Sequence, residues 1–384
     1  MRIGLNLLRF LPGKAGGTEI YFGNLLEYLM EVDKTNHYTL LCNENNSHHF
    51  DLSNTNFGKK IFIVKGKGIK RLLRSGLNKS NTLNLLKIGI NKMDLDIVHF
   101  PFTTINPMKV FIPSVLTFHD LQHEYYPEFF SRKELVFRRK TYQASAVEAT
   151  SIIAISEYTK KSLIEKYNIP PDKINVIYLS AGPDFKIIND AEKVERIRKK
   201  YHLKTPFMFY PAASWPHKNH KNLIEALRLI TDRYRFKGQL ILTGLKMHSH
   251  SEIMRKIETL QLEEKVRLLE YIPKDDLPCI YNLAKLMIFP SLFEGFGMPL
   301  IEAMACGCPI ICSDVTSIPE VVGNAAMTFN PNSPEDIAEK LISVWDDDNK
   351  RSRMRSLGFE RRKKFSWENT AKQTINIYNK VSSK

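Results

Sequence analysis

Short apolar runs alternate along the chain with longer segments of helical periodicity. Runs rich in branched and aromatic residues recur in the first half at positions 3–7, 38–42, 61–64, 96–100, 114–118, 151–155 and 174–178. Between them, residues 18–30, 132–149 and 156–167 have apolar positions at the spacing of an amphipathic helix, with Thr18 and Ser156 as expected N-caps. Strands that alternate with helices of this length predict βαβ units and a parallel sheet.

The same alternation starts again near Phe207. Strands are expected at 207–210, 239–243, 266–269, 286–289 and 309–312, with helices among them at 222–232 and 251–259. A polar, lysine-rich stretch at 182–204 separates the two series, and we place the domain boundary there. The pattern predicts an α/β protein with two Rossmann-like, parallel-sheet domains at residues 1–184 and 185–365.

Length and composition agree with two globular domains. The chain has 384 residues, of which 43% are hydrophobic and 25% charged, and domains of about 100–200 residues are common. The five cysteines are odd in number and lack the paired spacing of a zinc site, so we expect buried thiols in a reducing compartment. Arg9 interrupts the first apolar run, which is typical of a strand and not of a signal peptide. We expect a cytoplasmic protein, with a peripheral position on the inner face of the cell membrane left open.

The net charge of +15 leaves nucleic acid, anionic membranes and phosphorylated substrates open as partners. Between Lys59 and Lys92 there are ten Lys or Arg and no Asp or Glu, with leucines and isoleucines among them. This segment is either a solvated face or a surface that binds anionic lipid. It contains a single aromatic residue, Phe62, which disfavours stacking on nucleic-acid bases.

The most informative segment is FPSLFEGFGMPLIEAMACG, residues 289–307. A strand is followed by a glycine-containing loop and then by a helix, with Pro299 at a position where a missing N–H costs nothing. Gly307 fits the C-terminal cap of that helix. The free N–H groups at the start of the helix favour a phosphate, and Gly295 and Gly297 allow close backbone approach.

Two carboxylates stand eight residues apart in this segment: Glu294 in the loop and Glu302, which we expect in the first turn of the helix. Carboxylates at these places are suited to accept paired hydrogen bonds from sugar hydroxyls. An alternative is that Glu302 only complements the helix dipole.

The segment resembles the signature of two glutamates in retaining glycosyltransferases of the GT-B fold, in particular glycosyltransferase family four. Further motifs agree along nearly the whole chain: GGTE at 16–19, FHD at 118–120, SEYTK at 156–160, HKN at 217–219 and IPEVVG at 318–323. The resemblance implies two Rossmann-like domains that face each other across a cleft, with acceptor bound by the first and nucleotide sugar by the second. It also implies a C-terminal helix, residues 366–384, that crosses back to the first domain.

The resemblance further implies a retaining transferase that needs no metal and no cofactor other than a GDP- or UDP-linked sugar. The expected catalytic residues are His119, Glu294 and Lys218, and Asp120 is expected either to orient its loop or to contact the acceptor. Lys218 would stabilise the departing diphosphate. The residues expected to bind the donor are Gly16, Gly17, Ser214, Lys218, Tyr271, Ile272, Gly295, Phe296, Gly297, Met298, Pro299, Leu300 and Glu302.

One departure from the family pattern concerns a second cation near Lys218. Many relatives have an arginine about five residues earlier, where this chain has Ala213 and Ser214. His217, His220 or a backbone contact would have to replace it. Taken singly, the glycine pair, His119, Lys218 and Tyr271 are also compatible with ordinary structural or solvated positions.

Two other classes of function remain possible from the residues. The first is another GT-B enzyme: the glutamate pair together with His119 disfavours a sugar-nucleotide epimerase, and a phosphorylase would need a cofactor lysine and a longer chain. A module that binds nucleic acid or a membrane surface through its positive charge, without catalysis, is the second. We favour a hexosyltransferase of bacterial surface polysaccharide biosynthesis, of mannose or glucose type, that acts on a glycan or lipid-linked acceptor and binds no nucleic acid.

Overall fold

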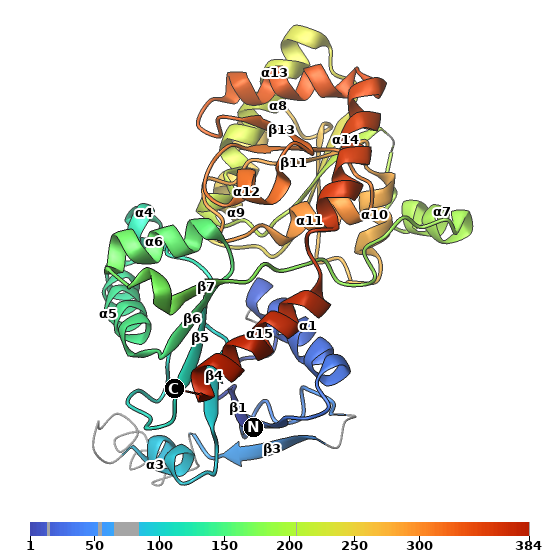
Figure 1. Cartoon of the computed structure of the whole chain (residues 1–384). Helices are drawn as coiled ribbons and strands as arrows, with labels where there is room; N and C mark the ends of the chain where they lie inside the picture. Colours follow the sequence, from blue (N-terminus) through green and yellow to red (C-terminus); the bar gives the residue numbers. More distant parts are fainter. Residues whose placement is uncertain (14–15, 53–55, 65–83, 205, 384) are drawn as a thin grey trace. The chain divides into compact units, whose positions relative to one another are not determined.

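The computed structural model describes residues 1–13, 16–52, 56–64, 84–204 and 206–383. The chain forms two compact units: residues 1–179 together with 367–384, and residues 180–366. In each unit, parallel strands form a central sheet and helices cover it (Figure 1). We describe the two units one after the other.

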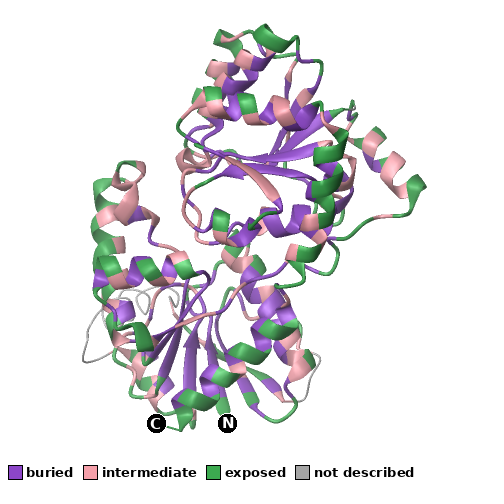
Figure 2. Cartoon of the chain, turned by 45° about the horizontal axis from the view of Figure 1, so that its top comes forward, coloured by how far each residue is buried: buried purple, intermediate pink, exposed green. Residues whose placement is uncertain are grey.

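The first unit contains a seven-stranded sheet in the order β3-β2-β1-β4-β5-β6-β7, and all of its neighbouring strands pair in parallel. The strands are β1 (Arg2–Asn6), β2 (His37–Asn43), β3 (Phe57–Phe62), β4 (Ile97–Phe100), β5 (Ser114–Phe118), β6 (Ser151–Ala154) and β7 (Ile174–Val176). Every residue of β4, β5 and β6 is buried, as expected for parallel strands covered on both faces. Figure 2 shows the central strands as buried and the helices with exposed outer faces, whereas most of the edge strand β3 is exposed.

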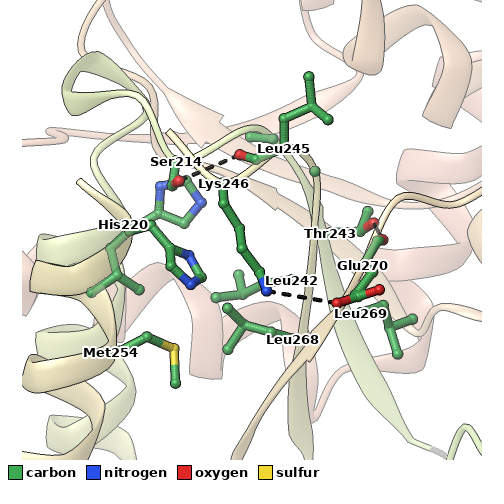
Figure 3. Close-up of a pocket in the computed structure, with 14 residues that line it drawn as sticks. Ser214, His220, Leu242, Thr243, Leu245, Lys246, Met254, Leu268, Leu269 and Glu270 are labelled. Carbon is green, nitrogen blue, oxygen red and sulfur yellow. Dashed lines mark hydrogen bonds and ion pairs between the residues drawn. The ribbon is translucent and has the colours of Figure 1, made fainter. Parts of the chain in front are cut away.

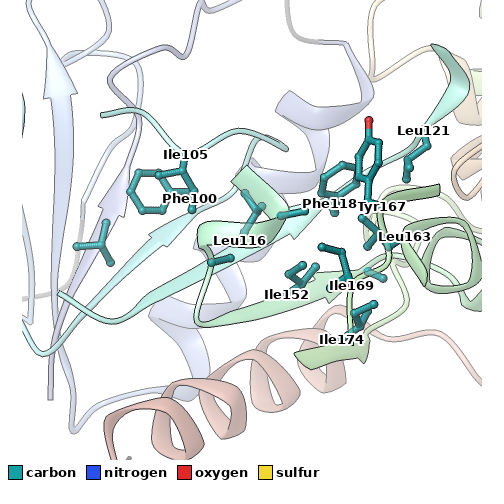
Figure 4. Close-up of a cluster of buried hydrophobic side chains, with 14 of the residues drawn as sticks. Phe100, Ile105, Leu116, Phe118, Leu121, Ile152, Leu163, Tyr167, Ile169 and Ile174 are labelled. Atoms are coloured by element: carbon teal, nitrogen blue, oxygen red, sulfur yellow. The ribbon is translucent and has the colours of Figure 1, made fainter. Parts of the chain in front are cut away.

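Helices connect the strands of this sheet. They are α1 (Gly17–Val32), α3 (Leu85–Asn91), α4 (Gln122–Tyr125), α5 (Arg132–Glu148) and α6 (Glu157–Tyr167), with short 3-10 turns at Pro127–Phe129 and Pro171–Lys173. One apolar core lies between the sheet and α6, where Phe118, Ile152 and Leu163 are fully buried (Figure 4). Ser156 caps α6 as predicted, since its hydroxyl accepts a hydrogen bond from Thr159 N at 3.0 Å.

The last helix, α15 (Trp367–Ser382), belongs to the first unit although it ends the chain. It packs against α1 and against β4, β5 and β6. The Thr370 hydroxyl donates to the Tyr178 carbonyl at 2.6 Å, and the Trp367 ring lies 6.2 Å from the Tyr21 ring. The predicted return of the C-terminal helix to the first domain is therefore confirmed (Figure 1).

The second unit contains a six-stranded parallel sheet in the order β10-β9-β8-β11-β12-β13. Its strands are β8 (Phe207–Pro211), β9 (Gln239–Thr243), β10 (Val266–Leu269), β11 (Leu286–Phe289), β12 (Ile310–Ser313) and β13 (Ala326–Phe329). The helices are α7 (Ala191–Lys200), α8 (His220–Tyr234), α9 (His250–Thr259), α10 (Leu277–Leu283), α11 (Met298–Ala305), α12 (Ile318–Val322), α13 (Pro334–Trp345) and α14 (Asp348–Arg362), with a 3-10 turn at Pro216–Lys218. Helix α8 packs with α9 and α13, and α11 packs with α10, α12 and α14.

The predicted class, an α/β protein with two parallel-sheet domains, is confirmed, and two local expectations were wrong or incomplete. Helix α1 begins at Gly17 with Gly16 as its N-cap, so Thr18 lies inside the first turn and does not cap it. The polar stretch 182–204 contains helix α7, and Asp190 is its N-cap. The helix packs against α10, and Ile197 is its one buried residue. Most residues of α7 are charged, so the segment was interpreted only as a polar stretch between the domains and its helix was not predicted.

Candidate active site

The segment that joins β11 to α11 has the geometry expected from its glycines. Gly297, the N-cap of α11, has φ +97° and ψ +59°, and a Cβ at this residue would lie 2.8 Å from Leu300 Cδ1. A side chain is therefore disfavoured both by the backbone conformation and by space. Pro299 lies in the first turn, as predicted. The loop from Gly295 to Gly297 thus leads directly into the N-terminal end of a helix, the end that favours a negatively charged group.

The other end of α11 is a Schellman cap. Gly307 has φ +66°, its N–H donates to the Met304 carbonyl at 3.2 Å, and the Cys308 N–H donates to the Ala303 carbonyl at 2.9 Å. The predicted role of Gly307 is confirmed. Glu302, however, lies in the second turn of α11 and not in the first, so it is not placed to complement the N-terminal end of the dipole.

Lys218 and Glu294 form an ion pair. Lys218 lies in the 3-10 turn after β8, Glu294 lies in the loop after β11, and Lys218 Nζ is 2.6 Å from Glu294 Oε1. The two side chains are 17% and 12% exposed, so the pair is largely desolvated. The ammonium also lies 5.6 Å from the centre of the Phe289 ring. Two of the residues predicted to act in catalysis are therefore in direct contact.

Neighbouring hydrogen bonds fix both ends of this pair. The Tyr210 hydroxyl donates to the Lys218 carbonyl at 2.7 Å. The Glu294 N–H donates to Thr316 Oγ1 at 3.2 Å, and the Ser317 hydroxyl donates to the Glu294 carbonyl at 3.0 Å. The positions of the charged groups are thus set by β8, β11 and the loop before α12.

Glu302 lies on α11, the helix that follows the loop with Glu294, and is 6% exposed. The Tyr281 hydroxyl, from α10, donates to Glu302 Oε2 at 2.9 Å. Desolvation is the largest effect on this carboxyl group and raises its pKa to about 7, although the Tyr281 hydrogen bond acts in the opposite direction. Tyr281 was not singled out from the sequence, because nothing in the local pattern around it marks the contact.

Ser214 connects two loops at the carboxyl end of the sheet. Its Oγ accepts from Met247 N at 2.6 Å, its N–H donates to the Leu245 carbonyl at 3.1 Å, and its carbonyl accepts from Ser249 N at 3.0 Å. Beside it lies a cavity of about 200 Å³ between the sheet and α9, with an ion pair between Lys246 and Glu270 at its edge (Figure 3). Through these hydrogen bonds, Ser214 holds the loop after β9 against the loop after β8.

His217 and His220 lie on either side of Lys218 and were among the candidates to replace the missing second cation. Burial lowers the pKa of His217 well below its usual value, and the neighbouring Lys218 acts in the same direction. Burial likewise lowers the pKa of His220 to about 3. Both rings are therefore neutral at physiological pH, and neither supplies a second positive charge.

Tyr271 and Ile272, expected near the nucleobase, differ in exposure. Tyr271 is 69% exposed and Ile272 is 7% exposed, directly after the end of β10. An exposed aromatic ring at the carboxyl end of a strand is available for stacking on a flat ligand.

In the first unit, Gly16 and Gly17 form the start of α1. Gly16 has φ +53°, and a Cβ at either residue would meet no atom within 4 Å. Two hydrogen bonds from Gly13 N to the Glu19 carboxylate, at 2.9 and 3.1 Å, tie the preceding loop to the first turn of the helix. The glycine pair thus lies open at a helix N-terminus, where anions bind readily.

His119 directly follows β5 and is 7% exposed. Its Nε2 lies 2.8 Å from the Pro101 carbonyl, so this nitrogen carries a proton and donates it. The Tyr21 ring packs nearly perpendicular to the imidazole, with 5.1 Å between the ring centres and 77° between the planes. Burial lowers the pKa of His119 despite the Pro101 hydrogen bond and the nearby Asp120. His119 is thus a neutral group held in one orientation.

Asp120 has a structural task at the start of α4. Its Oδ1 accepts a hydrogen bond from Gln122 N at 3.0 Å. This contact fits the first of the two roles considered for it, the orientation of its own loop. Its contact with an acceptor stays a prediction.

The basic segment from Lys59 to Lys92 falls largely outside the described residues, at 65–83. In the parts that are described, Lys59 and Lys60 are exposed on β3, beside Ile61, which is 54% exposed. Among the described helices, none is long and apolar enough to cross a membrane. Within the same residues, His, Cys, Asp and Glu form no cluster of three that suits a metal ion.

Comparison with known proteins gives matches to both units. The family described as Glycosyltransferase Family 4 matches residues 15–180, and the family described as Glycosyl transferases group 1 matches residues 193–361. The chain is 33% identical over 265 residues to O-antigen chain mannosyltransferase B of Escherichia coli, a match that covers 69% of this chain and 70% of that protein. It is 31% identical over 230 residues to O-antigen chain mannosyltransferase RfbU of Salmonella typhimurium, which covers 60% of each chain. The match to the mannosyltransferase WbdA of Escherichia coli, 32% identical, covers 66% of this chain but only 30% of WbdA.

Solved structures of glycosyltransferases share the fold. The crystal structure of HepE from Anabaena, in complex with UDP and glucose, has a TM-score of 0.77 at 17% identity and covers 99% of this chain and 100% of that chain. WaaG, a glycosyltransferase involved in lipopolysaccharide biosynthesis, has a TM-score of 0.73 at 17% identity and covers 98% and 99% of the two chains. The GT-B fold expected from the sequence is confirmed.

Proposed function

The chain belongs to glycosyltransferase family 4, the group 1 glycosyltransferases, and we propose that it transfers a hexose with retention of anomeric configuration and without a metal ion. The donor is a GDP- or UDP-linked sugar of mannose or glucose type, and the acceptor is a glycan or lipid-linked glycan. Mannose has the stronger support, because three relatives are named as mannosyltransferases. Two of these are named as O-antigen chain enzymes, which favours surface polysaccharide biosynthesis.

The observation that carries this proposal is the ion pair between Lys218 and Glu294. In the strand order β10-β9-β8-β11-β12-β13, the chain runs outward from β8 to β10 and then returns to β11. Open parallel sheets bind ligands at the carboxyl ends of the strands where such a reversal occurs. Lys218 follows β8 and Glu294 follows β11, so the pair lies at this point of the second sheet.

The chemistry proposed for this site is stabilisation of a leaving group. The bond between the anomeric carbon and the diphosphate oxygen breaks, and the diphosphate departs with the electron pair. Lys218, the amides of the glycine loop and the start of α11 stabilise the negative charge that develops there. The acceptor hydroxyl attacks from the same face, and its proton passes to the departing phosphate oxygen. Glu294 accepts hydrogen bonds from hydroxyls of the transferred sugar, which positions its anomeric carbon.

The remaining predicted residues take supporting roles in this proposal. Residues 185–365 bind the donor, with Glu302 and Tyr271 toward the nucleoside. Residues 1–184 bind the acceptor, and His119 contacts the transferred sugar. Gly16 and Gly17 approach the diphosphate at the start of α1. We place the enzyme in the cytoplasm, on the inner face of the cell membrane, with the basic segment from Lys59 to Lys92 as the surface that meets anionic lipid.

The experiment that tests the proposal is transfer by the purified chain in the presence of a chelator. GDP-mannose, GDP-glucose, UDP-glucose and UDP-mannose are each offered with a lipid-linked glycan acceptor, and the product is examined by proton NMR. We expect turnover with one nucleotide only and an axial donor linkage retained in the product. An inverted linkage, or activity that requires a divalent metal, would refute the mechanism. A chain that binds the nucleotides but releases no diphosphate with any acceptor would favour a binding module.

A further inference from the structure

A chain of buried hydrogen bonds leads from the C-terminal helix to the neighbourhood of His119. The Tyr378 hydroxyl, on α15, lies 2.6 Å from His99 Nδ1. His99 Nε2, on β4, lies 2.8 Å from Thr117 Oγ1, on β5. That hydroxyl in turn lies 2.9 Å from the Tyr21 hydroxyl, on α1. The four side chains lie in the first unit, and 279 residues separate Tyr378 from His99.

Tyr21 joins this chain of hydrogen bonds to His119. Thr117 and His119 are two residues apart at the end of β5, and alternate residues of a strand face the same side. Tyr21 meets both of them: its hydroxyl bonds to Thr117, and its ring packs nearly perpendicular to the imidazole of His119. Moving the hydroxyl of Tyr21 therefore tilts or withdraws the ring that supports His119.

The side chains in this series of hydrogen bonds are shielded from water and uncharged. Tyr21, His99, Thr117 and Tyr378 are each at most 1% exposed. Burial is the largest effect on His99 and lowers its pKa to about 3, with a smaller contribution from His119. Each hydrogen bond is thus made between neutral groups, and removing one hydroxyl leaves a buried neighbour without its partner.

His119 has other contacts, but they leave part of its orientation open. Its Nε2 donates to the Pro101 carbonyl, and its backbone N–H donates to Thr103 Oγ1 at 3.3 Å. The ring can still rotate about the Nε2 hydrogen bond unless a neighbour blocks its face. The Tyr21 ring packs against the imidazole at 77°, with 5.1 Å between the ring centres, and this contact limits that rotation.

We propose that Tyr21, Thr117, His99 and Tyr378 form a positioning chain, through which helix α15 holds the Tyr21 ring against His119. The proposal rests on the contact of His119 with the transferred sugar. It gives the C-terminal helix a task in catalysis: its last turns fix a side chain of the sugar site in the first unit. A misplacement of about 1 Å in such a site can cost on the order of 100-fold in rate.

A double-mutant cycle tests the positioning chain. Tyr21→Phe and Tyr378→Phe are each made in the wild-type chain and in His119→Ala, and kcat and KM for the donor are measured. In the wild-type background we expect each to lower kcat by about 10- to 100-fold. Affinity for the free nucleoside diphosphate should stay within about twofold, because the tyrosine substitutions leave Lys218 and the start of α11 unchanged. In the His119→Ala background, the same substitutions should have no further effect on kcat.

Tyr38→Phe is the matched control. Tyr38 is buried in the same unit, and its hydroxyl donates to Asp33 Oδ2 at 2.6 Å, outside the positioning chain. We expect its effect on kcat to be the same in both backgrounds. If Tyr378→Phe fails to fold, the effect of Tyr21→Phe on kcat alone tests the proposal. In that variant, Thr117 keeps its contact with His99.

The possible failures are distinguishable. His119→Ala could lower kcat while each tyrosine substitution lowers kcat by the same factor in that background as in the wild type. This result would refute the positioning chain and leave the role of His119 standing. If His119→Ala leaves kcat at the wild-type value, the proposed sugar contact is refuted, and the positioning chain with it. Wild-type kcat in both tyrosine variants would refute the positioning chain alone.

Discussion

Lys218 Nζ lies 2.6 Å from Glu294 Oε1 at the point where the second sheet reverses its strand order. The two residues are 76 positions apart in the sequence. Lys218 follows β8 and Glu294 follows β11, and these two strands are neighbours in the sheet. In the proposed complex, the donor diphosphate competes for the ammonium and the sugar hydroxyls compete for the carboxylate. The ion pair therefore holds both side chains in a defined orientation until the donor arrives.

Glu294→Gln should abolish most of the transfer activity. The change keeps the shape of the side chain and removes the charge that orients the sugar hydroxyls, so we expect kcat to fall by about 100-fold or more. Circular dichroism should show an unchanged fold. Glu339→Gln, on the exposed side of α13, is the matched control and should retain full activity. Turnover within a few-fold of wild type in Glu294→Gln would remove Glu294 from the site.

Glu302 should make stability depend on pH. Its pKa is raised to about 7 in the folded chain by desolvation, against an ordinary value of 4.5. The folded state thus binds the proton more tightly, and its contribution is fully present below about pH 4.5 and lost as pH rises through 7. The loss amounts to about 3 kcal/mol.

Thermal unfolding of the wild type and of Glu302→Gln between pH 4.5 and 8.5 measures this effect. Glutamine keeps the hydrogen bond from Tyr281 without ionising. We therefore expect the variant to gain stability relative to the wild type as pH rises to about 8, and the difference to be constant above that. A difference that does not change with pH would show that the carboxyl group has an ordinary pKa.

Gly244→Ala should destabilise the second unit strongly. Gly244 has φ +136°, and a Cβ there would lie 2.6 Å from the carbonyl carbon and oxygen of Ala212, which are backbone atoms. We expect a loss of about 3 kcal/mol in urea unfolding, together with weaker nucleotide binding, because Ala212 begins the loop that leads to Lys218. Gly23→Ala is the control: its Cβ would meet nothing within 4 Å inside helix α1, and it should gain about 1 kcal/mol. Equal stabilities of the two variants would contradict this account of the loop.

The basic segment should govern attachment to anionic membranes. Lys59, Lys60 and Lys92 are exposed, and each cation near an anionic surface contributes about 1 kcal/mol. Their joint replacement by glutamine should weaken binding to vesicles that contain phosphatidylglycerol by about 100-fold. The same change at Lys204, Lys237 and Lys364, exposed in the second unit, should leave binding nearly unchanged. Equal losses in the two triple variants would indicate that only net charge matters.

The parts of the fold that the sequence predicted are those written into local pattern. Periodicity located β5 and β9, the hydroxyl of Ser156 marked the start of α6, and Pro299 and Gly307 marked the two ends of α11 to within a residue or two. In each case the chemistry of one residue, or its spacing from near neighbours, is sufficient.

The parts that were missed depend on contacts between distant segments. Tyr281 lies 21 residues from Glu302 and is set against it by the packing of α10 on α11. His99 lies 279 residues from Tyr378 and meets it because α15 returns to the first sheet. Thr18 was a reasonable N-cap by residue type, but the structure places the N-cap two residues earlier, at Gly16. Register and packing, which no local pattern contains, decide such pairs.

The most direct test of the central claim is a calorimetric titration of the wild-type chain and of Lys218→Ala with GDP and with UDP. The account predicts that the wild type binds one of the two nucleotides, and that Lys218→Ala weakens this binding by about 10- to 100-fold, the value of a hydrogen bond to a charged group. Both proteins should show similar melting midpoints without nucleotide, apart from the loss of the ion pair. Equal affinities of the two proteins for the bound nucleotide would contradict the account, because Lys218 would then not touch the diphosphate.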